Sequence, residues 1–216
     1  MMGSDASLLI LGSGGHAKSL IDAIEHQGKY RIAGLVSLNQ SDSYRKYRVI
    51  GCDDDLESLF NQGIRYAAIG IGFLGAGDLR ERLVQRLKNI GFFLPLIIDP
   101  SAVIADDVEI GEGAFIGKGA ILNSGACIGD FSIINSGAIV EHDTFVSNYC
   151  HVAPGAVLCG EAKLGVCSFV GAGSVVLPQL SIGDHSIVGA GSVVLKNISS
   201  HEVWVGNPAK MMRENR

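Results

Sequence analysis

One periodic feature constrains the fold of this chain more than any other: from Ile98 to Val194, an aliphatic residue stands at every sixth position. The seventeen positions are Ile98, Ile104, Ile110, Ile116, Leu122, Ile128, Ile134, Val140, Val146, Val152, Leu158, Leu164, Val170, Val176, Ile182, Val188 and Val194. A small residue stands two places before most of them, and glycine, which permits turn conformations that side chains resist, commonly follows them. Neither a helix of period 3.6 nor a strand of period 2 requires such a phase. The phase predicts a solenoid in which one aliphatic side chain per flat side points inward and stacks on the next coil.

Residues 8 to 95 follow another pattern, in which short apolar stretches alternate with helical ones. Strands are predicted at residues 8–11, 32–36 and 66–71, and helices at residues 17–26, 54–61 and 78–90. This alternation predicts a small parallel α/β sheet, about half of a doubly wound dinucleotide fold. The sequence thus predicts two domains: residues 1–95 with α/β structure, and residues 96–216 with the solenoid and a C-terminal tail.

A glycine-rich turn follows the first predicted strand, with the sequence G-S-G-G-H-A-K from Gly12 to Lys18. It fits a relaxed dinucleotide fingerprint, in which backbone N–H groups at the start of a helix hold a phosphate. That fingerprint expects an acidic residue about 20 positions further on to hold the ribose. Here the second strand ends in Val36 and Ser37. The missing carboxylate argues against an NAD-dependent oxidoreductase.

Charge and cysteine usage exclude several classes of protein. The net charge of −5 argues against general nucleic-acid binding, which needs a basic surface to displace counterions. No apolar run approaches the roughly 20 residues of a membrane helix, and the first residues lack the pattern of a signal peptide. The five cysteines contain no C-x-x-C pair, so no metal site is expected, and we predict reduced thiols in a cytoplasmic protein.

The repeat resembles that of the hexapeptide-repeat acyltransferases, which form a triangular left-handed parallel β-helix with three hexapeptides per coil. With the G-S-G-G-H-A-K turn and the terminal G-N-P-A-K motif at residues 206–210, the chain resembles the sialic acid O-acetyltransferase (NeuD-like) family. Within that family it is most similar to the N-acetyltransferases that acetylate a 4-amino-4,6-dideoxy sugar on UDP, GDP or dTDP. The resemblance implies acetyl-CoA as co-substrate and a homotrimer with active sites between subunits.

The solenoid is poor in ionisable side chains, so His142, between Glu141 and Asp143, stands out. Acetyl transfer needs a base near neutral pKa, and a carboxylate beside the imidazole can hold its tautomer. The resemblance implies His142 as the catalytic base and Asp143 as its partner, because the family carries a histidine followed by an acidic residue there. Sequence alone leaves open whether Glu141 or Asp143 faces the ring.

The resemblance also implies two sets of binding residues. Coenzyme binding falls to His151, near the thioester, to Gly160, whose N–H would face the thioester carbonyl, and to two small lining residues, Ala172 and Ala190. Substrate binding falls to Gly14, Gly15 and His16 in the turn and to Asn135 near the acceptor sugar. Transfer is then direct, and the thiols of Cys150 and Cys159 are not expected to act as nucleophiles.

Other functions stay open. The same His–acid motif would serve O-acetylation of a sialic-acid-like sugar or of another small hydroxyl acceptor. A nucleotide-sensing or assembly module with an inactive solenoid is the alternative from another class. The sequence does not distinguish UDP, GDP and dTDP.

Overall fold

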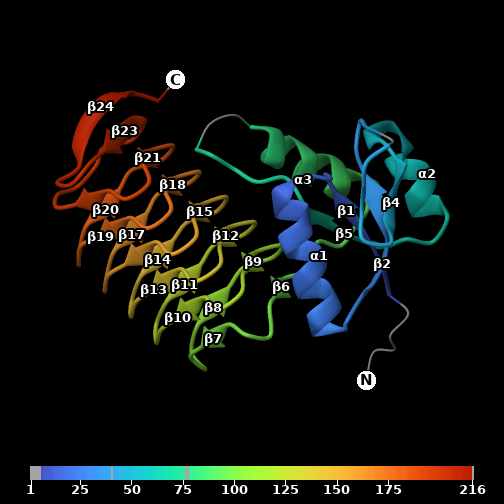
Figure 1. Cartoon of the computed structure of the whole chain (residues 1–216), viewed down its shortest axis with the longest axis horizontal. Coiled ribbons are helices and arrows are strands. Elements are labelled where there is room, and N and C mark those ends of the chain that lie inside the picture. Colours follow the sequence, from blue (N-terminus) through green and yellow to red (C-terminus); the bar gives the residue numbers. More distant parts are fainter. Residues whose placement is uncertain (1–5, 40, 76–77, 216) are drawn as a thin grey trace. The chain divides into compact units, whose positions relative to one another are not determined.

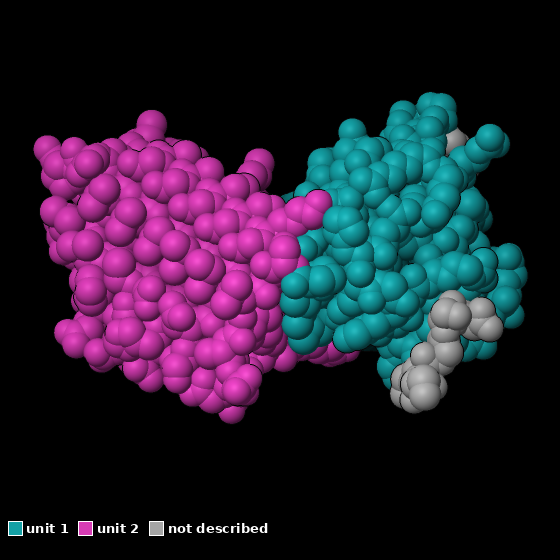
Figure 2. Space-filling view, turned by 60° about the horizontal axis from the view of Figure 1, so that its bottom comes forward, with its two compact units in different colours: residues 1–72, 78–100 teal, residues 73–77, 101–216 magenta. Residues whose placement is uncertain are grey.

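The computed structural model describes residues 6–39, 41–75 and 78–215. The chain separates into two compact units, which Figure 2 colours differently: unit 1 is Met1–Gly72 with Asp78–Pro100, and unit 2 is Phe73–Gly77 with Ser101–Arg216. Among the described residues, no helix combines the length and the apolar character needed to cross a membrane.

Unit 1 is a five-stranded sheet with helices, as the alternation of strands and helices predicted (Figure 1). Its strands are β1 (Ser7–Leu11), β2 (Arg31–Val36), β3 (Ser43–Tyr44), β4 (Tyr47–Gly51) and β5 (Tyr66–Ile69), in the order β3-β4-β2-β1-β5. Only β3 pairs antiparallel, with β4. The helices are α1 (Gly15–Gln27), α2 (Leu56–Asn61), which follows a 3₁₀ turn at Asp53–Asp55, and α3 (Leu79–Ile90). The last strand of unit 1 is β6 (Ile97–Ile98), which lies against α1.

The central strand of this sheet fixes where a ligand can bind. Strand β1 is apolar from Leu8 to Leu11, and these four residues are at most 1% exposed, as expected for a strand covered on both faces. The chain adds β2 and β4 on one side of β1 and then crosses to β5 on the other. In open parallel sheets, ligands bind at such a reversal, beyond the carboxyl ends of the strands. The glycine-rich turn follows β1 at this point.

Unit 2 is a left-handed parallel β-helix built from three flat faces, as predicted (Figure 1). Face 1 consists of β7 (Val103–Ile104), β10 (Ile121–Leu122), β13 (Ile139–Val140), β16 (Val157–Leu158), β19 (Val175–Val176) and β22 (Val193–Val194). Face 2 consists of β8 (Glu109–Ile110), β11 (Cys127–Ile128), β14 (Phe145–Val146), β17 (Lys163–Leu164) and β20 (Ser181–Ile182). Face 3 consists of β9 (Phe115–Ile116), β12 (Ile133–Ile134), β15 (His151–Val152), β18 (Phe169–Val170), β21 (Ile187–Val188), β23 (Glu202–Val205) and β24 (Lys210–Glu214).

The strand register confirms three hexapeptides per coil. Ile121 pairs with Ile139, and Ile139 pairs with Val157, so each residue stacks on the one eighteen positions away. From Ile116 to Val194 the predicted aliphatic residues point inward, and all of their side chains are at most 3% exposed. The small residues two places earlier are buried as well, and their hydroxyls bond the next coil: Ser132 Oγ accepts from the N–H of Cys150 at 3.0 Å.

In the tight turns between the faces of the β-helix, the residues with left-handed backbone are not the glycines that follow the aliphatic positions. Backbone with φ near +60° recurs at every sixth residue from Gly113 to Gly191, and seven of these fourteen residues are not glycine. The glycines after the aliphatic positions serve close approach instead: a Cβ on Gly171 would lie 2.5 Å from the backbone N of Ala190 on the next coil. The expectation that these glycines supply the turn conformation was therefore wrong, because packing between coils is what requires them.

Candidate active site

His142 and Asp143 lie together on the turn between β13 and β14, which we call edge 1/2 because it joins faces 1 and 2. His142 Nδ1 and Asp143 Oδ2 are 2.9 Å apart. Asp143 occupies a left-handed turn position with φ of 57°, which aspartate tolerates better than most side chains. Of the two carboxylates that the sequence left open, Asp143 is the one that bonds the ring. This bond assigns the proton to Nδ1 and leaves Nε2 as the free acceptor.

Gly160 lies one coil beyond His142 on the same edge. A Cβ built on Gly160 would lie 2.5 Å from His142 Nε2, so only glycine leaves the imidazole in its place. Within the part of the chain described, the N–H of Gly160 donates to no backbone carbonyl. At equivalent turn positions on another edge, such as Val166, the N–H donates to a side-chain oxygen one coil further, that of Asp184. The residue one coil beyond Gly160 is Pro178, whose side chain has no acceptor. The N–H of this turn position is therefore available to a ligand.

Negative charges surround the imidazole of His142. The hydrogen bond to Asp143 raises its pKa above the ordinary value, and the charges of Asp143, Glu141 and Glu161 act in the same direction. Glu161 lies on the next coil, where its Oε1 accepts from Gln179 Nε2 at 3.1 Å. Because His142 is more than half exposed, water screens these charges, and the Asp143 bond dominates.

His151 and Asn135 form a second pair, on face 3. Asn135 Nδ2 lies 3.1 Å from His151 Nε2, and His151 Nδ1 lies 2.5 Å from the backbone oxygen of Phe73. The ring is 6% exposed. Both ring nitrogens thus have partners in the protein.

The predicted residues of unit 2 fall on two different edges of the β-helix. His142, Asp143 and Gly160 lie on edge 1/2. Asn135, Ala172 and Ala190 lie on the turns between faces 3 and 1, which we call edge 3/1, and His151 lies on face 3 beside it. The structure brings the two alanines together one coil apart, since the N–H of Gly191 donates to Ala172 O at 2.8 Å. Face 1 separates the two groups within one chain.

In unit 1, Gly14 and Gly15 are exposed at the start of α1, and Gly14 caps this helix without a side chain. The N–H groups of the first turn can therefore face an anion. His16 lies in that first turn.

Sequence reasoning missed one carboxylate at this turn. Asp42 Oδ2 accepts from Ser13 Oγ at 2.5 Å, and Ser13 Oγ is 3.1 Å from Ser37 Oγ at the end of β2. Asn39 Nδ2 donates to the other Asp42 oxygen at 2.7 Å. The loop before β3 thus returns an acidic residue to the place where the fingerprint expects one. The sequence feature that could have predicted this contact is an aspartate, Asp42, within a few residues of the end of β2.

The cysteines do not offer a nucleophile. All five are free, and burial raises the pKa of Cys150 to about 11. Its Sγ lies 3.0 Å from the backbone oxygen of Gly165 and packs as a small core residue. Burial also raises the pKa of Cys159. A thiolate is the reactive form, so both pKa shifts disfavour a thiol nucleophile.

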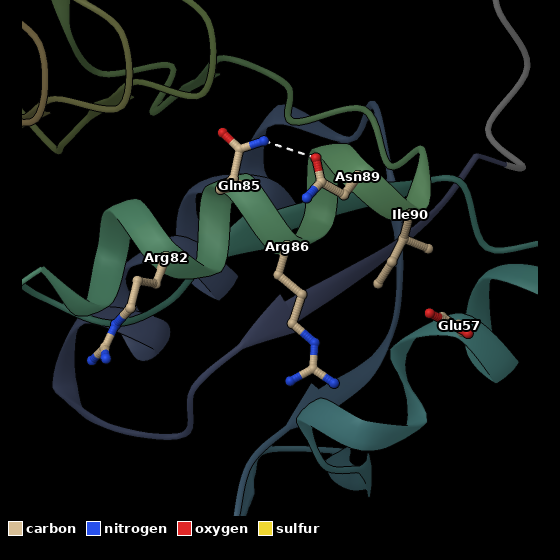
Figure 3. A pocket seen from close by; sticks show the side chains of 6 residues that line it. All are labelled: Glu57, Arg82, Gln85, Arg86, Asn89 and Ile90. Atoms are coloured by element: carbon tan, nitrogen blue, oxygen red, sulfur yellow. Dashed lines mark hydrogen bonds between the residues drawn. The ribbon is translucent and has the colours of Figure 1, made fainter.

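No cluster of three or more potential metal ligands occurs among the described residues. A surface pocket of about 390 Å³ lies between α2 and α3 (Figure 3), lined by Glu57, Arg82, Gln85, Arg86, Asn89 and Ile90. Arg86 pairs there with Asp54 at 3.2 Å, and none of the predicted site residues lines the pocket.

A left-handed β-helix with a histidine–carboxylate pair on one edge, joined to an α/β unit with a glycine-rich turn, defines a hexapeptide-repeat acyltransferase. Residues 7–87 match the PglD N-terminal domain. Perosamine N-acetyltransferase from Caulobacter crescentus, solved as a histidine-to-asparagine variant with CoA and GDP-perosamine, is 34% identical with a TM-score of 0.91 over 96% of this chain and 97% of that chain. This chain belongs to that family of nucleotide-linked amino-sugar N-acetyltransferases.

Other solved structures agree. The acetyltransferase domain of PglB from Neisseria gonorrhoeae, in complex with acetyl coenzyme A, is 28% identical with a TM-score of 0.89 over 96% of this chain and 100% of that chain. WeeI from Acinetobacter baumannii is 25% identical with a TM-score of 0.76 over 95% of this chain and 99% of that chain. A comparison with curated proteins gave no match.

Proposed function

We propose that this chain is an acetyl-CoA-dependent N-acetyltransferase that acts on the 4-amino group of a nucleotide-linked 4-amino-4,6-dideoxy sugar. The observation that carries the proposal is the arrangement on edge 1/2, where Asp143 holds His142 Nδ1 and Nε2 faces Gly160 on the next coil. The perosamine N-acetyltransferase complexes, which hold CoA and GDP-perosamine, support the choice of both substrates.

In the proposed reaction, His142 Nε2 accepts a proton from the amine as the nitrogen attacks the thioester carbon. The Asp143 carboxylate stabilises the imidazolium that forms. The N–H of Gly160 donates to the oxygen that becomes negative at the tetrahedral stage. The C–S bond then breaks, and His142 returns the proton to the departing thiolate, so that no acyl-enzyme is needed.

The glycine-rich turn is the proposed site for the nucleotide, with Gly14, Gly15 and His16 around the diphosphate. Backbone N–H groups at the start of α1 suit phosphate oxygens. Asp42, fixed by Ser13 and Asn39, has the chemistry to accept hydrogen bonds from ribose hydroxyls or from N–H groups of a base. We place the reaction in the cytoplasm, which agrees with five free cysteines.

The outer surface of face 1 supports a homotrimer with shared sites. Its outward residues are aliphatic in all six coils: Val103, Ile121, Ile139, Val157, Val175 and Val193. The outward residues of face 2 are mixed, namely Glu109, Cys127, Phe145, Lys163 and Ser181. Apolar surface of this extent calls for a partner.

Face 1 borders both edge 1/2 and edge 3/1. If three copies turn face 1 toward a common axis, edge 1/2 of one copy meets edge 3/1 of the next. His142 and Gly160 of one copy would then lie beside edge 3/1 of the partner copy, the edge that carries the other predicted residues of unit 2. Coenzyme binding by His151, Ala172 and Ala190 and acceptor contact by Asn135 are proposed on this basis.

The proposal is tested by thiol release from acetyl-CoA with UDP-, GDP- and dTDP-linked 4-amino-4,6-dideoxy sugars. We expect turnover with one of them and a loss of at least 100-fold in kcat for His142→Ala, the scale of general-base catalysis. His185→Ala, which removes a histidine from another edge, is the matched control and keeps its activity. Turnover only with a 4-hydroxy sugar would refute N-acetylation in favour of O-acetylation. Tight acetyl-CoA binding without any turnover would also contradict the proposal.

A further inference from the structure

We propose that His151 is a positioning residue for the acceptor: it is a latch that holds the segment Phe73–Gly75 on face 3 and orients Asn135. We call this segment the strap. The inference rests on the proposed function for its kinetic consequences, whereas the latch itself is a property of unit 2 alone.

The contacts of His151 define its tautomer. The backbone oxygen of Phe73 can only accept a hydrogen bond, so the proton of the neutral ring is on Nδ1. Nε2 is then an acceptor, and the partner at 3.1 Å is the amide nitrogen of Asn135, a donor. The ring also meets Phe169 edge to face, with centroids 5.2 Å apart. A buried imidazole with both nitrogens bonded is held in one orientation.

A second anchor holds the far end of the strap. Asn215 Nδ2 donates to Gly75 O and to His185 O, both at 2.7 Å, and Asn215 is 8% exposed. Gly75 has φ of 83°, and a Cβ there would overlap the side chain of Ile187. The strap therefore lies directly on face 3, fixed by His151 at Phe73 and by Asn215 at Gly75.

The strap continues the segment that flanks the glycine-rich turn. Gly70 N donates to Leu11 O at 2.7 Å, and the position of a Cβ on Gly72 is 3.8 Å from His16 Cβ. The strap is thus the direct continuation in the chain of residues 70–72, which pack against the glycine-rich turn. The imidazole that holds Phe73 also orients Asn135, the residue expected near the acceptor sugar. His151 thus acts through Phe73 and Asn135 rather than on the reacting atoms.

Three replacements separate the two bonds of the latch. His151→Asn retains a donor near the place of Nδ1, His151→Gln retains a polar group near the place of Nε2, and His151→Leu retains neither. Loss of one buried hydrogen bond corresponds to about a tenfold effect. We expect the acceptor KM to rise about tenfold in all three variants. His151→Asn and His151→Leu lose the bond that orients Asn135, whereas His151→Gln and His151→Leu lose the bond that holds Phe73. The pH profile of kcat should not change, because His151 takes no proton from the reacting amine.

Hydrogen–deuterium exchange provides a readout that does not require activity. Peptides that cover residues 70–75 should exchange faster in His151→Gln, His151→Leu and Asn215→Leu, but not in His151→Asn. If the wild-type enzyme acetylates no amino sugar while this pattern holds, the proposed function fails and the latch stands. Equal exchange in all variants would overturn the latch. A lost acid limb in the pH profile with an unchanged acceptor KM would overturn it too, because His151 would then be a titrating catalytic group.

Discussion

Replacing Gly160 by alanine tests whether the site depends on the close contact between Gly160 and the imidazole of His142 on the preceding coil. The added Cβ would lie 2.5 Å from His142 Nε2 and 2.6 Å from Cε1, whereas ordinary carbon contacts begin at about 3.5 Å. The imidazole must therefore move by about 1 Å. Misplacement of a catalytic group by that distance costs on the order of 100-fold in rate, which corresponds to about 2.7 kcal/mol in the activation free energy.

The same substitution should hardly affect folding. The backbone of Gly160 is not in the left-handed region, so alanine adds no backbone strain there. The clashing ring is 57% exposed and can swing into solvent. We expect a change in the free energy of unfolding within about 1 kcal/mol, or a Tm shift of about 2–4 °C at most for a chain of this length.

The assay is thiol release under saturating acetyl-CoA, with Tm measured in parallel. A double-mutant cycle supplies the control: in a His142→Ala background, Gly160→Ala should cause no further loss of kcat, because the ring through which it acts is gone. An undiminished loss in that background would refute the reasoning and assign the effect to the added methyl group itself, acting on the ligand and not through the ring. Wild-type activity in the single variant would refute it as well.

Four further outcomes are expected. Because the bond to Asp143 raises the pKa of His142, the acid limb of kcat/KM should lie above pH 6.5 in wild type and move to lower pH in Asp143→Asn. A pH–rate profile measures both, and a wild-type limb below pH 6.5 would contradict this prediction. Val157→Glu should prevent assembly of the proposed trimer; light scattering that still gave three copies would contradict this. Cys150→Ser should keep full activity and lose under about 1.5 kcal/mol of stability by denaturant unfolding, since serine fills the equivalent position in other coils. Asp42→Asn should raise the KM for the nucleotide sugar about tenfold and leave that for acetyl-CoA unchanged, the loss of a charged hydrogen bond being the cause.

The β-helix could be predicted from sequence because its period is long, regular and physically restrictive. An eighteen-residue coil follows from three hexapeptides, and it places Gly160 over His142 and His151 over Ile133 by counting alone. The separation of the predicted residues between two edges follows from the same arithmetic. The tautomer of His151 does not, because its partner Phe73 is 78 residues away in sequence.

The features that sequence reasoning missed in unit 1 have local causes. The β3–β4 hairpin turns at Arg45, which has φ of 54°, and Arg45-Lys46 lacks the Asn-Gly or Asp-Gly signal of such turns. Strand β3 has only two residues, too few for a period to show. Asp42 precedes this hairpin, so its position beside Ser13 depends on a turn that the sequence does not predict.

The final strand affects whether the β-helices of different molecules can stack end to end. Each coil of a parallel β-helix ends in unpaired N–H and C=O groups that could template the coil of another molecule, and an open stack of that kind has no natural length. On face 3, β24 runs antiparallel to β23, against the direction of the parallel strands before it. Its outer residues are exposed and include Lys210, Arg213 and Glu214. Reversed direction and charged side chains make this end of face 3 a poor template for the coil of another molecule.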